Sequence, residues 1–103
     1  MKRVSRVIQY VDGIIEKIPS AEKRKQAYVH TYGVSQYCAL LAAKRGLDPE
    51  LAYISGLLHD IYTYFSGSGM YHAYSGAEMA RVAIRNMNIF SDDEKIIILS
   101  AIF

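Results

Sequence analysis

The chain has 103 residues, of which 51% are hydrophobic, and a formal net charge of +2. This length fits one domain, and the composition is that of a globular protein, which excludes a disordered chain. The small net charge gives no indication of a nucleic-acid partner.

The cysteine content and the lengths of the apolar runs indicate where in the cell the protein is expected. Cys38 is the single cysteine, which excludes a disulfide within the chain and suits a reducing compartment. The apolar runs are shorter than the roughly 20 residues that cross a bilayer. We therefore expect a cytoplasmic protein without a membrane segment, and we expect Cys38 to be a small buried apolar residue.

The N-terminal part of the chain predicts two helices. Apolar residues recur every three or four positions over residues 4–18, which is the pattern of one buried helix face. Pro19 ends that helix, and Ser20 can cap a second helix that runs to about Arg45. Gly46 follows as the left-handed residue that commonly ends a helix.

The second helix carries a histidine, His30, on the stripe that we expect to face the core. The stripe consists of Ala27, Val34, Tyr37, Cys38, Leu41 and Ala42.

The third helix is predicted to begin at Asp48-Pro49-Glu50, which combines a capping side chain, a proline in the first turn and an acid. Residues 51–62 are apolar almost all round, so this helix should lie in the middle of a bundle. It ends in His59-Asp60. An acid at that end opposes the helix dipole and indicates a nearby cation.

Two further helices complete the predicted fold. A Ser/Gly loop at 66–69 precedes a fourth helix over about 71–88, with His72 in its first turn. A capping box at 91–94 opens a fifth helix. No segment alternates with period two. The sequence therefore predicts an all-α fold, an irregular bundle of about five helices, in a single domain over residues 1–103.

The three histidines, His30, His59 and His72, all lie on or beside apolar helical faces. Imidazole is a common ligand of transition metals, and Asp60 adds an anionic oxygen. Imidazoles and a carboxylate from different helices would form a partial coordination sphere whose open positions hold water. The alternative for each histidine is a core side chain bonded to a carbonyl, and spacing alone leaves the two interpretations about even.

Three stretches, residues 28–34, 47–61 and 72–78, resemble the HD superfamily of metal-dependent phosphohydrolases. The string Gly-Leu-Leu-His-Asp after an Asp-Pro-Glu helix start is specific, and the resemblance covers roughly residues 25–103. It implies an HD-domain-like bundle, in which residues 1–19 form an N-terminal helix outside the core motif.

The resemblance also implies a role for each matching residue. His30 matches the first metal-ligating histidine, and His59 and Asp60 match the pair that names the family. His72 matches a histidine that helps to hold a second ion in two-metal members or faces the substrate phosphate in one-metal members. The implied cofactor is a divalent metal ion, with Mn, Fe, Co, Ni, Zn and Mg all open. Asp60 and His72 are the candidate catalytic residues.

The reaction implied by the resemblance is hydrolysis of a phosphate ester, often of a nucleotide, by a metal-bound water. The partner would then be a small phosphorylated substrate, and the oligomeric state is left open. Lys23 and Arg24 lie near the start of the His30 helix and are candidate contacts to the phosphate. A solvated helix face is the more common role of such residues.

Departures from the family pattern support a second hypothesis, a non-catalytic helical module for ligand sensing or protein contact. The family has a further metal-ligating aspartate in its final core helix, and this chain stops at Phe103, before that position. We expect the native helix to continue. Tyr62 and Thr63 stand where many members have Gly-Lys, and no acid lies between Asp60 and Glu78, which leaves the catalytic base unidentified.

Overall fold

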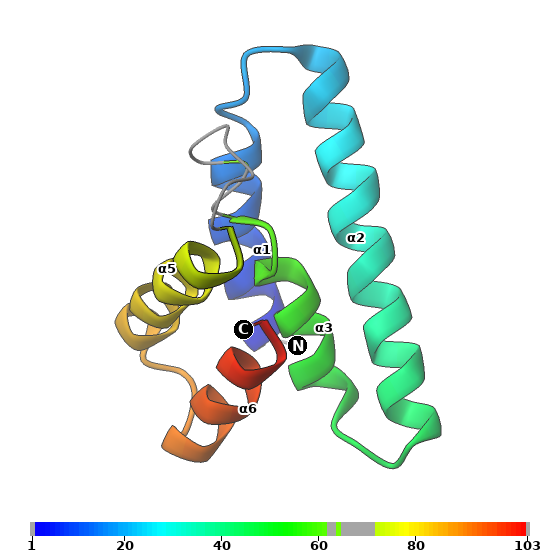
Figure 1. Cartoon of the computed structure of the whole chain (residues 1–103), viewed down its shortest axis with the longest axis vertical. Helices are drawn as coiled ribbons and strands as arrows, with labels where there is room; N and C mark the ends of the chain where they lie inside the picture. The colour runs from blue at the N-terminus through cyan, green and yellow to red at the C-terminus, as the bar shows by residue number, and fades with distance from the viewer. Residues whose placement is uncertain (1, 62–63, 65–71, 103) are drawn as a thin grey trace.

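The computed structural model is a bundle of α-helices (Figure 1), and it describes residues 2–61, 64 and 72–102. The helices are α1 (Lys2–Ile15), α2 (Ala21–Lys44), α3 (Pro49–Leu58), α5 (His72–Met87) and α6 (Asp92–Ile102). No strand occurs among these residues, which confirms the all-α prediction. None of the helices in the described ranges combines the length and the apolar character needed to cross a membrane. The predicted Ser/Gly loop lies outside the described residues.

The ends of the helices are formed by the capping residues that the sequence predicted. The side chains of Ser20 and Asp48 accept backbone N–H groups from the first turns of α2 and α3, at 3.2 and 2.9 Å. In the capping box of α6, Ser91 Oγ accepts the N–H of Glu94 at 3.2 Å, and the Glu94 carboxylate accepts the N–H of Ser91 at 2.8 Å. Gly46 has a φ of +72°, as expected after a helix end.

The first helix is shorter than predicted, because α1 ends at Ile15 rather than at Ile18. The N–H of Ile18 donates to the carbonyl of Ile15 at 3.0 Å, three residues back, so the chain tightens before Pro19. A residue that precedes proline is disfavoured in the helical conformation, which explains why Ile18 is not part of the helix.

The face that α2 turns to the core also differs from the predicted stripe. Ala27 and Ala42 of that stripe are buried as predicted, but the other buried residues are Thr31 and Ser35. His30 and Tyr37, which we expected to face the core, are 52% and 62% exposed. Cys38, which we expected to be buried, is only partly buried. Ser35 Oγ donates to the carbonyl of Thr31 at 2.9 Å, and Thr31 Oγ1 donates to the Tyr64 hydroxyl at 3.1 Å. Small hydroxyl residues are therefore accommodated in this contact with their polar atoms satisfied.

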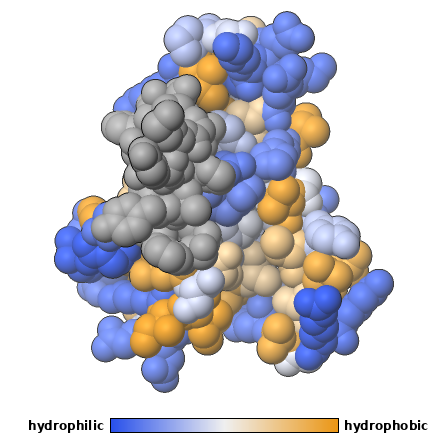
Figure 2. Space-filling view, in the orientation of Figure 1, coloured by the Kyte–Doolittle hydropathy of each residue, from blue (hydrophilic) through white to orange (hydrophobic). Residues whose placement is uncertain are grey.

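The central helix of the bundle is α3, which packs against α1, α2 and α6. Its buried residues are Leu51, Ile54, Ser55, Gly56, Leu57 and Leu58. Val7, Val11 and Ile15 of α1 are fully buried in the same core. Figure 2 shows hydrophobic side chains gathered over the lower half of the molecule, where α3 lies between α2 and α6. The central position predicted for the third helix is confirmed.

Candidate metal centre

Three of the predicted site residues meet where α3 ends beside α2. The Nε2 atoms of His30 and His59 lie 3.0 and 2.9 Å from the same oxygen, Oδ2 of Asp60. The two imidazole rings are tilted against each other, with their centroids 5.3 Å apart. Thirty positions of sequence separate His30 from Asp60, so only the packing of α3 on α2 brings them together.

The end of α3 explains how two adjacent residues serve one site. Neighbours on a helix point about 100° apart, which keeps them from sharing a ligand in a helix interior. Here α3 ends at Leu58, and His59 and Asp60 form the turn that follows. Asp60 can therefore come within reach of the Nε2 atom of the preceding histidine.

A glycine one turn earlier brings the two helices close. A Cβ atom on Gly56 would lie 2.7 Å from Cα of Ser35, too near for any side chain. We did not predict a role for Gly56 from the sequence. The signal was present, because an isolated glycine within an apolar helical pattern commonly marks a close approach of another backbone.

The carbonyl of Gly56 also sets the proton position on His59. Nδ1 of His59 lies 2.6 Å from that oxygen, which can only accept, so Nδ1 carries a hydrogen. The lone pair on Nε2 then faces the Asp60 carboxylate. Two acceptors at 2.9 Å need a positive charge between them, which is either a second proton on His59 or a bound cation.

His59 and Asp60 each stabilise the charged form of the other. Burial lowers the pKa of His59, but its hydrogen bonds to Asp60 and to the Gly56 carbonyl outweigh burial and raise the pKa overall. The hydrogen bond from His59 lowers the pKa of Asp60, and His30 adds to this effect. The side chains of His30, His59 and Asp60 are 52%, 28% and 20% exposed. The cluster is thus charged and open to solvent on the His30 side.

The donor set fits a divalent metal ion. Each of the three residues offers one ligand atom, and these atoms all lie within 4.8 Å of one another. Ligands about 2.0–2.2 Å from a metal ion, at right angles to each other, are about 3 Å apart. The two contacts to Oδ2 have that length. The Gly56 carbonyl supplies the outer hydrogen bond that metal-ligating histidines commonly make.

The other predicted site residues are less closely tied to this cluster. His72 begins α5, but its side chain lies outside the described part of the chain. Nη1 of Arg24 donates to the carbonyls of Ile18 and Pro19, at 2.6 and 3.2 Å, so this guanidinium closes the turn between α1 and α2. Lys23 is exposed on α2. A contact of Lys23 or Arg24 with phosphate stays a prediction.

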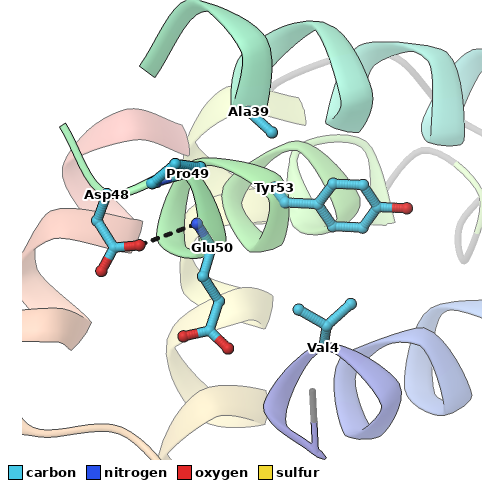
Figure 3. Close-up of a pocket in the computed structure, with 6 residues that line it drawn as sticks. All are labelled: Val4, Ala39, Asp48, Pro49, Glu50 and Tyr53. Atoms are coloured by element: carbon cyan, nitrogen blue, oxygen red, sulfur yellow. Dashed lines mark hydrogen bonds between the residues drawn. The ribbon is translucent and has the colours of Figure 1, made fainter. Parts of the chain in front are cut away.

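A cavity of about 340 Å³ lies at the opposite end of α3 from His59 and Asp60 (Figure 3). Its lining consists of Val4, Ala39, Asp48, Pro49, Glu50 and Tyr53. It includes no member of the His-His-Asp cluster and is mostly apolar. The cavity is therefore not part of the candidate metal centre.

These features define an all-α domain whose central helix ends in a His-His-Asp cluster. The family model of the HD domain matches residues 27–101. The chain belongs to the HD domain family, as the resemblance in the sequence predicted, and this family points to the superfamily of metal-dependent hydrolases. Comparisons with curated proteins and with solved structures find no match.

Proposed function

We propose that the chain binds a divalent metal ion through His30, His59 and Asp60 and hydrolyses a small phosphate ester, with nucleotides as one substrate class. The observation that carries this proposal is the convergence of two imidazole Nε2 atoms on one carboxylate oxygen. The HD domain match supports it. The single cysteine suits a cytoplasmic location for this activity.

Each residue has a distinct part in this function. A bound divalent ion would acidify a water molecule and stabilise the negative charge that develops at phosphorus. Asp60 supplies the anionic charge of the site, and the Gly56 carbonyl orients the ring of His59. The exposed side of His30 is where a substrate phosphate can approach. His72 is proposed, from the resemblance alone, to hold a second ion or to face the phosphate.

The test is metal binding and hydrolysis by variants of Asp60. We expect Asp60→Asn, which keeps the shape and removes the charge, to weaken binding of Mn²⁺ or Zn²⁺ by at least about 100-fold and to abolish hydrolysis of a panel of phosphoesters. Asp93→Asn is the matched control, because Asp93 is an exposed acid in α6. If Asp60→Asn binds metal and hydrolyses the panel as the wild type does, the proposal is wrong.

A second candidate is a non-catalytic metal-binding module. The absence of an acid between Asp60 and Glu78 favours it, because such an acid acts on the water in some one-metal members of the resembled family. This candidate predicts tight, Asp60-dependent metal binding with no hydrolysis of any ester in the panel. The same experiment therefore separates the two functions.

A further inference from the structure

The side of α2 that faces away from the core carries a line of exposed residues. Seven residues form this line, which we call the outer stripe: Glu22, Gln26, Val29, Gly33, Tyr37, Leu40 and Lys44. They recur every three or four positions, so they share one helix face. Val29, Tyr37 and Leu40 are 67%, 62% and 54% exposed. Because α2 packs against α3 and α1 with its opposite face, the outer stripe lies uncovered by the described helices (Figure 1).

The outer stripe has the same spacing in both directions from Gly33. Its members lie 4, 7 and 11 positions away on either side. A second copy of α2 could pack antiparallel on the first, with a two-fold axis at Gly33. A residue a given number of positions before Gly33 then faces the residue of the second copy that lies the same number of positions after Gly33. Val29 then faces Tyr37 of the second copy, Gln26 faces Leu40, and Glu22 faces Lys44. Apolar residues meet near the centre and opposite charges meet at both ends. A parallel pairing would instead place Glu22 against Glu22.

Gly33 lies at the centre of the stripe, and no contact with the described part of the chain requires a glycine there. Among the residues that the structure describes, a Cβ atom there would meet nothing within 4 Å. Glycine in a helix interior destabilises the helix relative to alanine, and among the described residues no contact requires glycine at position 33 or at position 13. A residue without a side chain at a helix crossing allows two backbones to approach closely. Gly33 differs from Gly13 because it lies at the centre of the exposed outer stripe, where a second helix would gain from this close approach.

We propose that the outer stripe is the interface of a symmetric dimer, in which α2 of a second copy packs antiparallel on α2 and crosses it at Gly33. The occupant is a second copy because the charges and the spacing are complementary to the stripe itself. Val29 directly precedes His30, so Tyr37 of the second copy would lie at the edge of the metal cluster. The proposal stands independently of the proposed hydrolysis.

The first test blocks the crossing point. We expect the wild type to sediment as a dimer, and we expect Gly33→Arg to raise the dissociation constant by at least about 100-fold. Gly13→Arg is the matched control, since Gly13 is also an exposed helical glycine and a Cβ atom on it would meet no described residue within 4 Å. It should dimerise as the wild type does. A monomeric wild type up to millimolar concentration, or a Gly33→Arg variant that dimerises normally, overturns the proposal.

The second test uses charge and separates pairing from helix stability. Glu22→Lys or Lys44→Glu alone places like charges against each other at both ends of the dimer, and each should weaken dimerisation about tenfold at low salt. An equimolar mixture of the two variants restores opposite charges at both ends, so heterodimers should form with the affinity of the wild type. Each chain is unchanged by mixing, so helix stability cannot account for recovery. A mixture that dimerises no better than its components contradicts the antiparallel pairing, and one that dimerises more tightly than the wild type indicates a parallel pairing.

Discussion

Gly56 contributes to the cluster in two ways, through its missing side chain and through its backbone carbonyl. Without a side chain, it lets the backbone of α3 approach Ser35 of α2. Its carbonyl holds Nδ1 of His59 at 2.6 Å, which leaves Nε2 to face Asp60. Helix packing and the orientation of a candidate ligand thus depend on one residue.

Replacing that glycine should therefore disturb the packing. Gly56→Ala forces a Cβ to within 2.7 Å of backbone that cannot move cheaply. We expect the free energy of unfolding to fall by about 1–3 kcal/mol, measured by urea denaturation. Gly13→Ala is the control, because its Cβ would meet none of the residues in the described ranges within 4 Å, and it should be neutral or slightly stabilising. Equal effects of the two substitutions would show that the close approach at Gly56 is unimportant.

The pH dependence of stability follows from His59 and Asp60 in the metal-free protein. The lowered pKa of Asp60 contributes stability that is fully present above the ordinary value, 3.8, and is lost as pH falls through the folded value. The raised pKa of His59 contributes stability that is fully present below the ordinary value, 6.5, and is lost as pH rises through the folded value. The contribution of the pair should therefore be largest between these two ordinary values, and Asp60→Asn should flatten the profile of unfolding temperature against pH.

The stabilisation by added metal should increase with pH, whereas the contribution of protonated His59 to stability decreases with pH. A metal ion competes with the proton for Nε2, so the increase in unfolding temperature on adding Zn²⁺ should grow as pH rises through the raised pKa of His59. Asp93→Asn should behave as the wild type does. A metal-induced increase that is the same at all pH values would count against ligation by His59.

Two tyrosines connect α1 to α2 at the level of elements. The hydroxyl of Tyr32 donates to Asp12 at 2.6 Å, and that of Tyr28 donates to Glu16 at 2.5 Å. Their rings are stacked, with centroids 6.3 Å apart. Burial and the bond to Asp12 raise the pKa of Tyr32, and the bond to Glu16 raises the pKa of Tyr28 to about 12. Both hydroxyls therefore keep their protons, and these bonds, well above neutral pH.

Removing one hydroxyl should loosen this connection. We expect Tyr32→Phe to lower the free energy of unfolding by about 1–2 kcal/mol, because it removes a hydrogen bond to a carboxylate. A raised tyrosine pKa contributes stability below its ordinary value that is lost as pH rises through the folded value, so variant and wild type should converge at strongly alkaline pH. Tyr53→Phe, at a partly buried tyrosine of α3 outside the outer stripe, serves as the control in denaturant titrations. A difference that persists at high pH would exclude this bond as its cause.

For the whole molecule, α1 is part of the packed core although it precedes the region matched by the family model. Arg3 strengthens its attachment, because its guanidinium pairs with Glu50 of α3 and Glu94 of α6 and lies 5.2 Å from the ring centroid of Phe90. We therefore propose that α1 and the HD region fold as one cooperative unit.

This cooperativity can be measured at Ile15, which is fully buried at the end of α1. Ile15→Ala should lower the free energy of unfolding by about 2–5 kcal/mol, with a single transition in circular dichroism and in tyrosine fluorescence. Ile97→Ala, at a position that is 53% exposed, should change stability by less than about 0.5 kcal/mol. Two separate transitions, or no effect of Ile15→Ala, would show that α1 is an appendage.

The sequence by itself determined the helices, their caps and the family. Ser20, Asp48 and the Ser91–Glu94 box act on N–H groups within a few residues, so local order suffices to recognise them. The motif that ends in His59 and Asp60 is likewise a short contiguous string. Residue spacing also placed α3 at the centre, because a helix that is apolar all round can only be buried.

Only the tertiary structure decided which face of α2 is buried and which atoms meet at its edge. The apolar pattern favoured the side with Tyr37, whereas the core receives Thr31 and Ser35. At Ser35, the close approach of Gly56 leaves room for a small side chain alone. The same approach sets His30 against Asp60. Contacts between residues thirty positions apart depend on how two helices pack, and no local pattern contains that information.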